Sequence, residues 1–128
     1  MIHQRIFSTP EGNKPGGPYA LGVVAEGKFL FVSGQGPWCP VQKKFVRGSV
    51  AEQTRLTLEN VRRIVEAAGG DIRNTVSARV YLQMHTESTW KEMNEVFEEF
   101  FGEHKPVRTT IGAQLLNIDV EIDVVVAM

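Results

Sequence analysis

Two charged residues in apolar, strand-like stretches are the strongest candidates for chemistry in this chain. Arg108 follows Pro106 into an alternating segment, and Glu121 stands between Val120 and Ile122. A guanidinium held in a cleft can bind a carboxylate through two parallel hydrogen bonds, and a buried glutamate can act as a general acid or base. The competing interpretation for both residues is a solvated edge charge or a structural ion pair, the commoner role of a charge on a strand.

Two glycine-rich segments could bring a ligand close to backbone N–H groups. They are Gly16–Tyr19 and Ser33–Pro37. Neither is a phosphate loop, because no Lys-Ser/Thr pair follows and no helix begins directly after them. Gly34 ends an apolar stretch and would let a ligand approach the backbone, with the hydroxyls of Ser33 and Tyr19 beside it. A pair of ordinary turns is the alternative.

The sequence carries no pattern for a metal or an organic cofactor. His3, His85 and His104 are far apart, and none has a second ligand at helical or hairpin spacing. The one cysteine, Cys39, lies in a Pro-Trp-Cys-Pro segment that predicts a rigid turn and a structural thiol. We therefore expect no metal and no cofactor.

Composition limits the class of protein. The 128 residues allow one domain over residues 1–128, and 42% hydrophobic against 23% charged residues is typical of a globular core. Fourteen basic and fifteen acidic side chains give a net charge of -1, which disfavours nucleic-acid binding. A single cysteine, no signal-peptide pattern and no run of 18 apolar residues favour a cytoplasmic protein without a membrane partner.

Two amphipathic helices are predicted. The first begins at a capping box of Ser49 and Glu52 and ends at Gly69-Gly70. Its apolar stripe comprises Ala51, Thr54, Leu58, Val61, Val65 and Ala68. The second begins near Ser88 or Thr89, with Glu92 completing a box, and ends at Gly102. Its buried face comprises Trp90, Met93, Phe97, Phe100 and Phe101.

Alternating or apolar segments predict the strands. They are Gln4–Phe7, Leu21–Ala25, Lys28–Ser33, Phe45–Arg47, Thr75–Met84, Val107–Ala113 and Val120–Val126. Glu26-Gly27 predicts a hairpin between the second and third of these. The order of elements predicts an α+β sandwich with both helices on one face of a mostly antiparallel six-stranded sheet. The open face is then expected to carry Tyr81, Arg108, Thr110 and Glu121, with Phe29 and Phe31 nearby, and to bind a second copy of the chain.

Six motifs in order resemble the RidA/YjgF family of small imine deaminases, also called the endoribonuclease L-PSP family. They are Gly17-Pro18-Tyr19, Phe31-Val32-Ser33-Gly34-Gln35, the first helix with Gln53, Asn60 and Glu66-Ala67-Ala68-Gly69, the second helix with Asn94, Pro106-Val107-Arg108, and Val120-Glu121-Ile122-Asp123. Each motif alone is weak, and the ordered set is specific.

The resemblance implies a chorismate mutase-like fold assembled as a homotrimer with a ligand cleft at each subunit interface. In active members, the arginine matching Arg108 binds the substrate carboxylate. Glu121 and the backbone carbonyl at the position of Thr110 would hold the attacking water, and the cleft would be lined by Tyr19, Ser33, Gly34 and Asn94. The implied reaction hydrolyses 2-imino acids such as 2-iminopropanoate and 2-iminobutanoate, or their enamine tautomers, to 2-keto acids and ammonia without a cofactor.

Other functions compete with this prediction. Some family members have a cysteine at the position of Thr110, so the resemblance carries over only a backbone role there. The Leu115–Ile118 stretch and the loop before Pro106 are shorter than in some members, and this altered rim would permit a larger aminomuconate-like or aminoacrylate-type substrate, which is one alternative. A second is a carboxylate-binding regulatory trimer without turnover. A ribonuclease or translation inhibitor is a third, disfavoured by the near-neutral charge and the lack of paired histidines.

Overall fold

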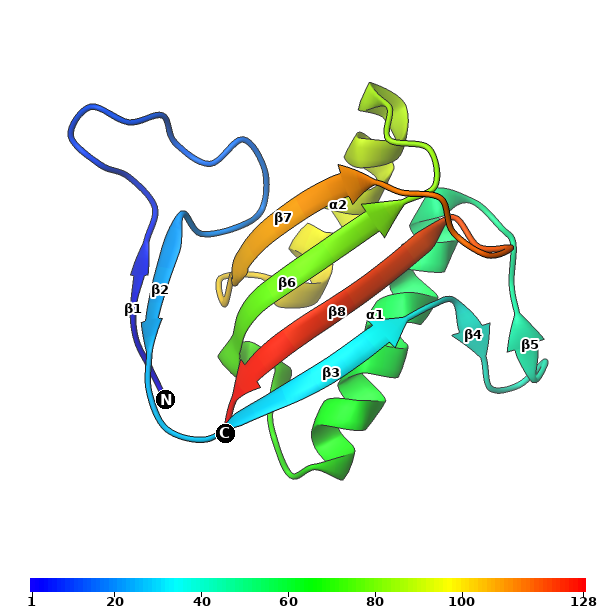
Figure 1. Cartoon of the computed structure of the whole chain (residues 1–128), viewed down its shortest axis with the longest axis horizontal. Helices are drawn as coiled ribbons and strands as arrows, with labels where there is room; N and C mark the ends of the chain where they lie inside the picture. The colour runs from blue at the N-terminus through cyan, green and yellow to red at the C-terminus, as the bar shows by residue number, and fades with distance from the viewer.

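The central sheet has four strands, and both helices pack on one of its faces. A computed structural model describes residues 1–128. The sheet order is β3 (Phe29–Gln35), β8 (Val120–Ala127), β6 (Thr75–Leu82) and β7 (Val107–Gly112). The helices α1 (Val50–Ala67) and α2 (Glu87–Phe101) lie behind this sheet in Figure 1. The predicted α+β class with two helices on one face is confirmed.

The sheet is mostly antiparallel, with one parallel pair. β8 pairs antiparallel with both β3 and β6, and β6 pairs parallel with β7. The parallel pair arises because α2 connects β6 to β7 and returns the chain to the same end of the sheet.

The predicted count of six strands in one sheet is wrong. β1 (Ile2–Ile6) and β2 (Gly22–Ala25) form a separate antiparallel pair, called the ribbon below, which stands beside β7 in Figure 1. A single parallel bridge between Ala20 and Val107 joins the two sheets. Another small pair, β4 (Trp38–Cys39) with β5 (Lys44–Phe45), lies at the opposite side. β5 overlaps the predicted strand Phe45–Arg47, whereas β4 occupies the segment around Cys39 for which the sequence predicted a turn.

The predicted hairpin at Glu26-Gly27 is also wrong. Gly27 turns the chain with φ of 108°, but β2 pairs with β1, and β3 pairs with β8 at the edge of the main sheet. Local turn residues fix a change of direction, whereas the pairing partner is chosen by which strand offers a matching apolar face. The C-terminal strand β8 offers that face to β3.

The helices begin and end close to the predicted residues. Ser49 caps α1, and its side chain accepts a hydrogen bond from the Glu52 backbone N–H at 3.1 Å. α2 begins at Glu87 instead of Ser88 or Thr89, because Thr86 is the N-cap and shares a capping box with Thr89. Gly69 and Gly102, with φ of 82° and 55°, follow the helices as predicted.

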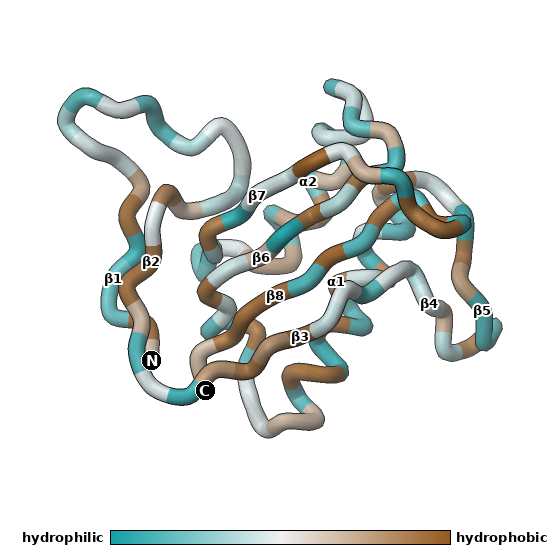
Figure 2. The backbone as a smooth tube through the Cα atoms, viewed as in Figure 1, coloured by the Kyte–Doolittle hydropathy of each residue, from teal (hydrophilic) through white to brown (hydrophobic).

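The core lies between the helices and the covered face of the sheet. Figure 2 shows hydrophobic residues concentrated along β8 and the neighbouring part of β3. The central buried set is Leu58, Val61, Val65, Ala78, Val80, Leu82, Met93, Phe97, Val120, Ile122, Val124 and Val126. Ala68, predicted in the buried stripe of the first helix, lies beyond the end of α1 and is exposed. Met84, the last residue of the predicted strand Thr75–Met84, lies beyond the end of β6 and is also exposed.

β7 has the opposite orientation to the one predicted. In the β6–β7 register Arg108 lies opposite Ala78 and Thr110 opposite Val80, and both β6 residues face the helices. Arg108 and Thr110 therefore point toward α2, while Thr109 and Ile111 are exposed. The alternation of β7 was recognised in the sequence, but polar residues occupy its covered face, so hydrophobicity indicated the wrong side.

Candidate functional site

Arg108 is a buried cation without a carboxylate partner. Its exposed fraction is 9%, and none of the ion pairs in the structure includes it. The guanidinium carbon lies 5.0 Å from the ring centroid of Tyr19 and 4.9 Å from that of Phe97. Its Nη1 contacts the sulfur of Met93 at 3.6 Å, which is a weak acceptor.

This environment lowers the pKa of Arg108 to about 10, mainly because burial penalises the charged form. The side chain still carries its charge at neutral pH. A buried cation surrounded by aromatic rings and a thioether is strongly stabilised by an anion that can reach it. The structure therefore presents an anion-binding group that has no anion within the chain.

Other unsatisfied polar atoms lie around the same guanidinium. The buried atoms without a hydrogen-bond partner include Arg108 Nε, Asn94 Oδ1 and Thr110 Oγ1. Gly17 leaves room between these groups, because a Cβ there would lie 3.2 Å from Arg108 Nη2 and 3.4 Å from Asn94 Nδ2. Buried polar atoms are rarely left unpaired in proteins, so this concentration indicates a place for a small polar ligand.

The residues that surround Arg108 come from three distant parts of the sequence. Arg108 and Thr110 lie on β7, Asn94 lies on α2, and Tyr19 lies in the loop between the ribbon strands. Cavities of about 500 and 530 Å³ flank this loop, one lined by Pro18 and Asn94 and the other by Gly17 and Tyr19. The sequence-predicted Tyr19, Asn94, Arg108 and Thr110 are therefore brought together.

Glu121 lies in a second group, on the open face of the sheet. It is opposite Tyr81 in the β6–β8 register, and its carboxylate packs against Gly34 of β3. The β3–β8 register shifts between Val32 and Gln35, which places Gly34 and Ser33 at this irregularity. Ser33, Gly34 and Glu121 therefore form a second group, which within one chain is separate from the residues around Arg108.

A polar network beside Glu121 was not identified from the sequence. Asp123 accepts hydrogen bonds from Arg79 Nε at 2.8 Å and from the Tyr81 hydroxyl at 3.0 Å. Burial and this bond to Asp123 raise the pKa of Tyr81. The signal was available, since Arg79 and Tyr81 are two residues apart on one strand face and Asp123 is two residues after Glu121.

Met93 and Phe97, which contact the guanidinium, were predicted only as core residues of α2. Their position against Arg108 follows from the orientation of β7, which the sequence did not reveal.

The two groups lie on opposite faces of the sheet within one chain. Arg108 faces α2, whereas Glu121 faces away from it. β6 separates their strands, so their backbones are roughly 10 Å apart across the sheet, in addition to their offset along it. A single chain therefore does not bring Arg108 and Glu121 to one reacting centre.

Gly34 gives a direct test of the Glu121 group. A Cβ at residue 34 would lie 2.9 Å from Glu121 Cδ and closer still to its Oε2. Gly34 does not have a positive φ, so the backbone accepts alanine and the flexible carboxylate moves instead. We expect the free energy of unfolding of Gly34→Ala to stay within about 1 kcal/mol of the wild-type value. The new methyl group should nevertheless displace the Glu121 carboxylate.

If the chain hydrolyses 2-imino acids, as the resemblance implies, turnover by Gly34→Ala is expected to fall by at least about tenfold, because proton transfer would then depend on the position of the Glu121 carboxylate. Gly22→Ala is the matched control, since a Cβ there meets Ile6 at an ordinary 3.5 Å. Equal activity of Gly34→Ala and Gly22→Ala would show that turnover does not depend on the position of the Glu121 carboxylate.

The structure provides no metal centre and no helix suited to a bilayer. No group of three or more His, Cys, Asp and Glu side chains is placed to hold a metal ion. Neither helix has the length and apolar character needed to cross a membrane.

Comparisons with known proteins place the chain in a family. The family model described as Endoribonuclease L-PSP matches residues 11–128. The RutC family protein PH0854 of Pyrococcus horikoshii is 38% identical over 121 residues, which is 94% of each chain. An Escherichia coli protein named "Putative reactive intermediate deaminase TdcF" is 34% identical over 124 residues, 94% of this chain and 93% of its own.

Solved structures agree with these sequence relatives. A crystal structure of E. coli TdcF with bound serine is 32% identical and has a TM-score of 0.71, covering 98% of this chain and 99% of that one. With this fold and these sequence matches, the chain belongs to the endoribonuclease L-PSP family, which is the RidA/YjgF family.

Proposed function

We propose that this protein hydrolyses reactive 2-imino acids of the 2-iminopropanoate and 2-iminobutanoate type to 2-keto acids and ammonia. The observation that carries the proposal is the buried guanidinium of Arg108, which has no carboxylate partner in the chain. A 2-imino acid supplies the missing carboxylate and places an electrophilic C=N carbon directly beside it. The polar atoms around Arg108 suit a ligand of that small size.

The reaction needs one anchored carboxylate and one proton carrier. Arg108 donates two hydrogen bonds to the carboxylate and so orients the imine carbon for attack. Glu121 accepts a proton from water as the water oxygen bonds to that carbon, with the Thr110 backbone carbonyl as the second group proposed to hold the water. The protonated Glu121 then donates this proton to the nitrogen, which gives a carbinolamine. Glu121 next takes the proton of the carbinol hydroxyl and passes it to the nitrogen, so that the C–N bond breaks, the C=O bond forms and ammonia leaves.

We further propose that the working site forms between copies of the chain in a homotrimer. Two facts support this assembly. The carboxylate anchor and the proton carrier lie on opposite faces of one chain, so a neighbour must supply one of them. The open face also exposes large apolar side chains that a second copy would bury, with Phe31 75% and Ile111 46% exposed.

A relative supports the class of substrate. The E. coli TdcF structure contains serine, an amino acid with a carboxylate on the carbon that bears nitrogen. A 2-imino acid has the same arrangement of carboxylate and nitrogen around one carbon. The structural similarity makes a ligand of this kind the first to test.

The test is a timed decay of the imine. A pyridoxal-phosphate dehydratase acting on serine or threonine releases the enamine and imine, and the 2-keto acid is followed as it appears. We expect this protein to speed 2-keto acid formation beyond the spontaneous rate, and Arg108→Ala to abolish the increase. The spontaneous rate in the presence of wild-type protein would contradict the enzyme proposal. If 2-oxobutanoate still bound under those conditions, a carboxylate-binding regulatory role would replace it.

A further inference from the structure

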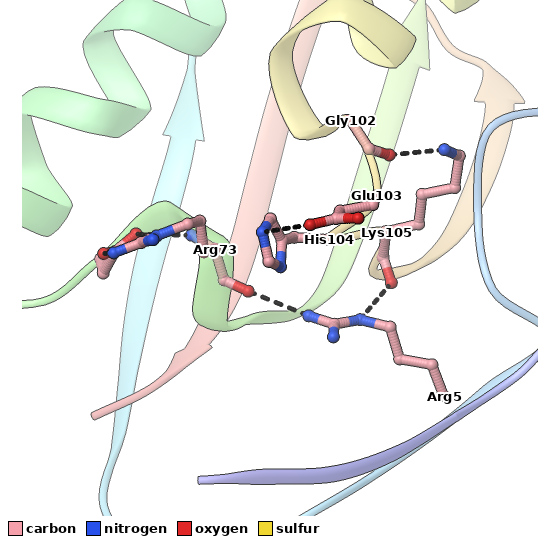
Figure 3. A network of polar contacts seen from close by, with 7 residues as sticks. Arg5, Arg73, Gly102, Glu103, His104 and Lys105 are labelled. Carbon is pink, nitrogen blue, oxygen red and sulfur yellow. Dashed lines mark hydrogen bonds and ion pairs between the residues drawn. The ribbon is translucent and has the colours of Figure 1, made fainter.

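The ribbon formed by β1 and β2 is attached to the main sheet at few points. The backbone N–H of Ala20 donates to the carbonyl of Pro106 at 2.9 Å, next to the single bridge with Val107. The other connection is a side chain. Arg5 of β1 donates from Nε to the Lys105 carbonyl at 3.1 Å and from Nη2 to the Arg73 carbonyl at 2.9 Å (Figure 3).

These two carbonyls lie where two strands of the main sheet begin. Lys105 is three residues before Arg108, in the loop that joins α2 to β7. Arg73 lies in a short 3₁₀ helix (Ile72–Asn74) directly before β6. One guanidinium therefore joins the ribbon to the starts of β6 and β7. A planar fork can reach both carbonyls at once, which a lysine ammonium on its flexible stem does less well.

The ribbon also carries one wall of the site around Arg108. The loop between β1 and β2 contains Gly17 and Tyr19, and the Tyr19 ring lies 5.0 Å from the Arg108 guanidinium. The strand that follows Lys105 carries Arg108 itself. The bonds of Arg5 thus connect the segment that holds Tyr19 to the segment that holds Arg108.

We propose that Arg5 is a positioning residue for carboxylate binding, because it fixes the distance between the Tyr19 wall and the Arg108 guanidinium. The inference rests on the proposed function and extends it to a residue that does not touch the ligand. Without Arg5, the ribbon keeps its backbone attachment at Ala20 but loses two charge-assisted hydrogen bonds. The wall then samples positions in which Tyr19 and Gly17 no longer close over the guanidinium.

The test compares ligand affinity with turnover in Arg5→Met, using 2-oxobutanoate as the probe in calorimetric titration. We expect the dissociation constant of 2-oxobutanoate and KM for the imine to rise roughly tenfold, the equivalent of one lost charge-assisted bond. The kcat is expected to stay within about twofold, because Glu121 and the water do not depend on the ribbon. Arg5→Lys should give an intermediate dissociation constant.

Arg62→Met is the matched control. Arg62 is also partly buried and charged, but it pairs with Glu59 at 3.2 Å and stacks on Phe100 outside the site. The Arg62→Met substitution should lower thermal stability as much as Arg5→Met or more. The dissociation constant of 2-oxobutanoate should be unchanged in Arg62→Met.

The outcomes separate this proposal from the proposed function. Wild-type protein that neither binds 2-oxobutanoate nor speeds imine decay would overturn the function itself. If the wild type binds 2-oxobutanoate and Arg5→Met binds it with the same dissociation constant, Arg5 is only structural and the positioning role is overturned. A lowered melting temperature of Arg5→Met would not change this conclusion. If Arg5→Met does not fold, the affinity of Arg5→Lys decides in the same way.

Discussion

Replacing Arg108 with methionine is expected to abolish imine hydrolysis and to stabilise the folded protein at the same time. The loss of activity follows from the loss of the carboxylate anchor, which both binds the substrate and orients it. The gain in stability follows from the environment of the guanidinium. Methionine fills much of the same volume among Phe97, Met93 and Tyr19 and brings no charge into that site.

The size and pH range of the stability gain follow from the pKa of Arg108. Burial lowers this pKa to about 10, well below the ordinary arginine value. Below about pH 10 the folded protein holds a charge that is removed from water, whereas the unfolded chain keeps the same charge in water. This desolvation lowers the free energy of unfolding of the wild type. Methionine removes the penalty but also the contacts between the cation and the rings, so the expected net gain is about 2 kcal/mol. Above that pH the folded state releases the proton before the unfolded state does, so the wild-type free energy of unfolding rises.

Denaturant unfolding of the assembled protein at pH 7 and pH 9 measures this effect. Arg108→Met should unfold at a higher midpoint than the wild type, by a similar amount at both pH values. Arg108→Lys is the control, because it retains a buried charge and should show no gain. Saturating 2-oxobutanoate should stabilise the wild type and leave Arg108→Met unchanged. A methionine variant less stable than the wild type would mean that the guanidinium is already paired in the assembled protein.

The helices and all strands except β4 were predictable along the chain because their signals are local. The N-cap at Ser49, the positive-φ glycines Gly69 and Gly102 at the helix ends, and the apolar spacing in both helices depend on neighbouring residues alone. The membership of Arg108 and Glu121 in strands was equally accessible from alternation.

Strand pairing and the orientation of β7 were not accessible in this way. The turn at Glu26-Gly27 indicated a hairpin, but the long apolar strand β8 pairs with β3 instead. In β7, the face toward α2 carries Arg108 and Thr110, so the usual inference from hydrophobicity chose the wrong side. Sequence analysis assumes that the covered face of a strand is the hydrophobic one. Polar residues on a covered face are exceptions to this rule, and such exceptions concentrate at functional sites.

Mixing two inactive variants is expected to restore activity, because the proposed site combines Arg108 of one copy with Glu121 of another. Arg108→Met lacks the anchor, and Glu121→Gln lacks the proton carrier while it keeps a side chain of the same shape. Each variant alone should have at most a few per cent of wild-type turnover, roughly what remains when a general base is lost. In a closed ring, every interface between a Glu121→Gln copy and an Arg108→Met neighbour in the productive order regains both groups.

The recovered activity has a definite size. When equal amounts are unfolded together and refolded, about one interface in four pairs an intact Arg108 with an intact Glu121, whatever the number of subunits in a cyclic assembly. We therefore expect about a quarter of wild-type turnover from the refolded mixture, and no increase above the residual few per cent from the two variants mixed after assembly. As the control, Arg108→Met is refolded with an equal amount of a double variant that carries both Arg108→Met and Glu121→Gln. This mixture contains no intact Arg108 and should stay inactive. Refolded mixtures with no recovered turnover, although gel filtration shows assembled protein, would place both groups of the site within one chain and refute the shared cleft.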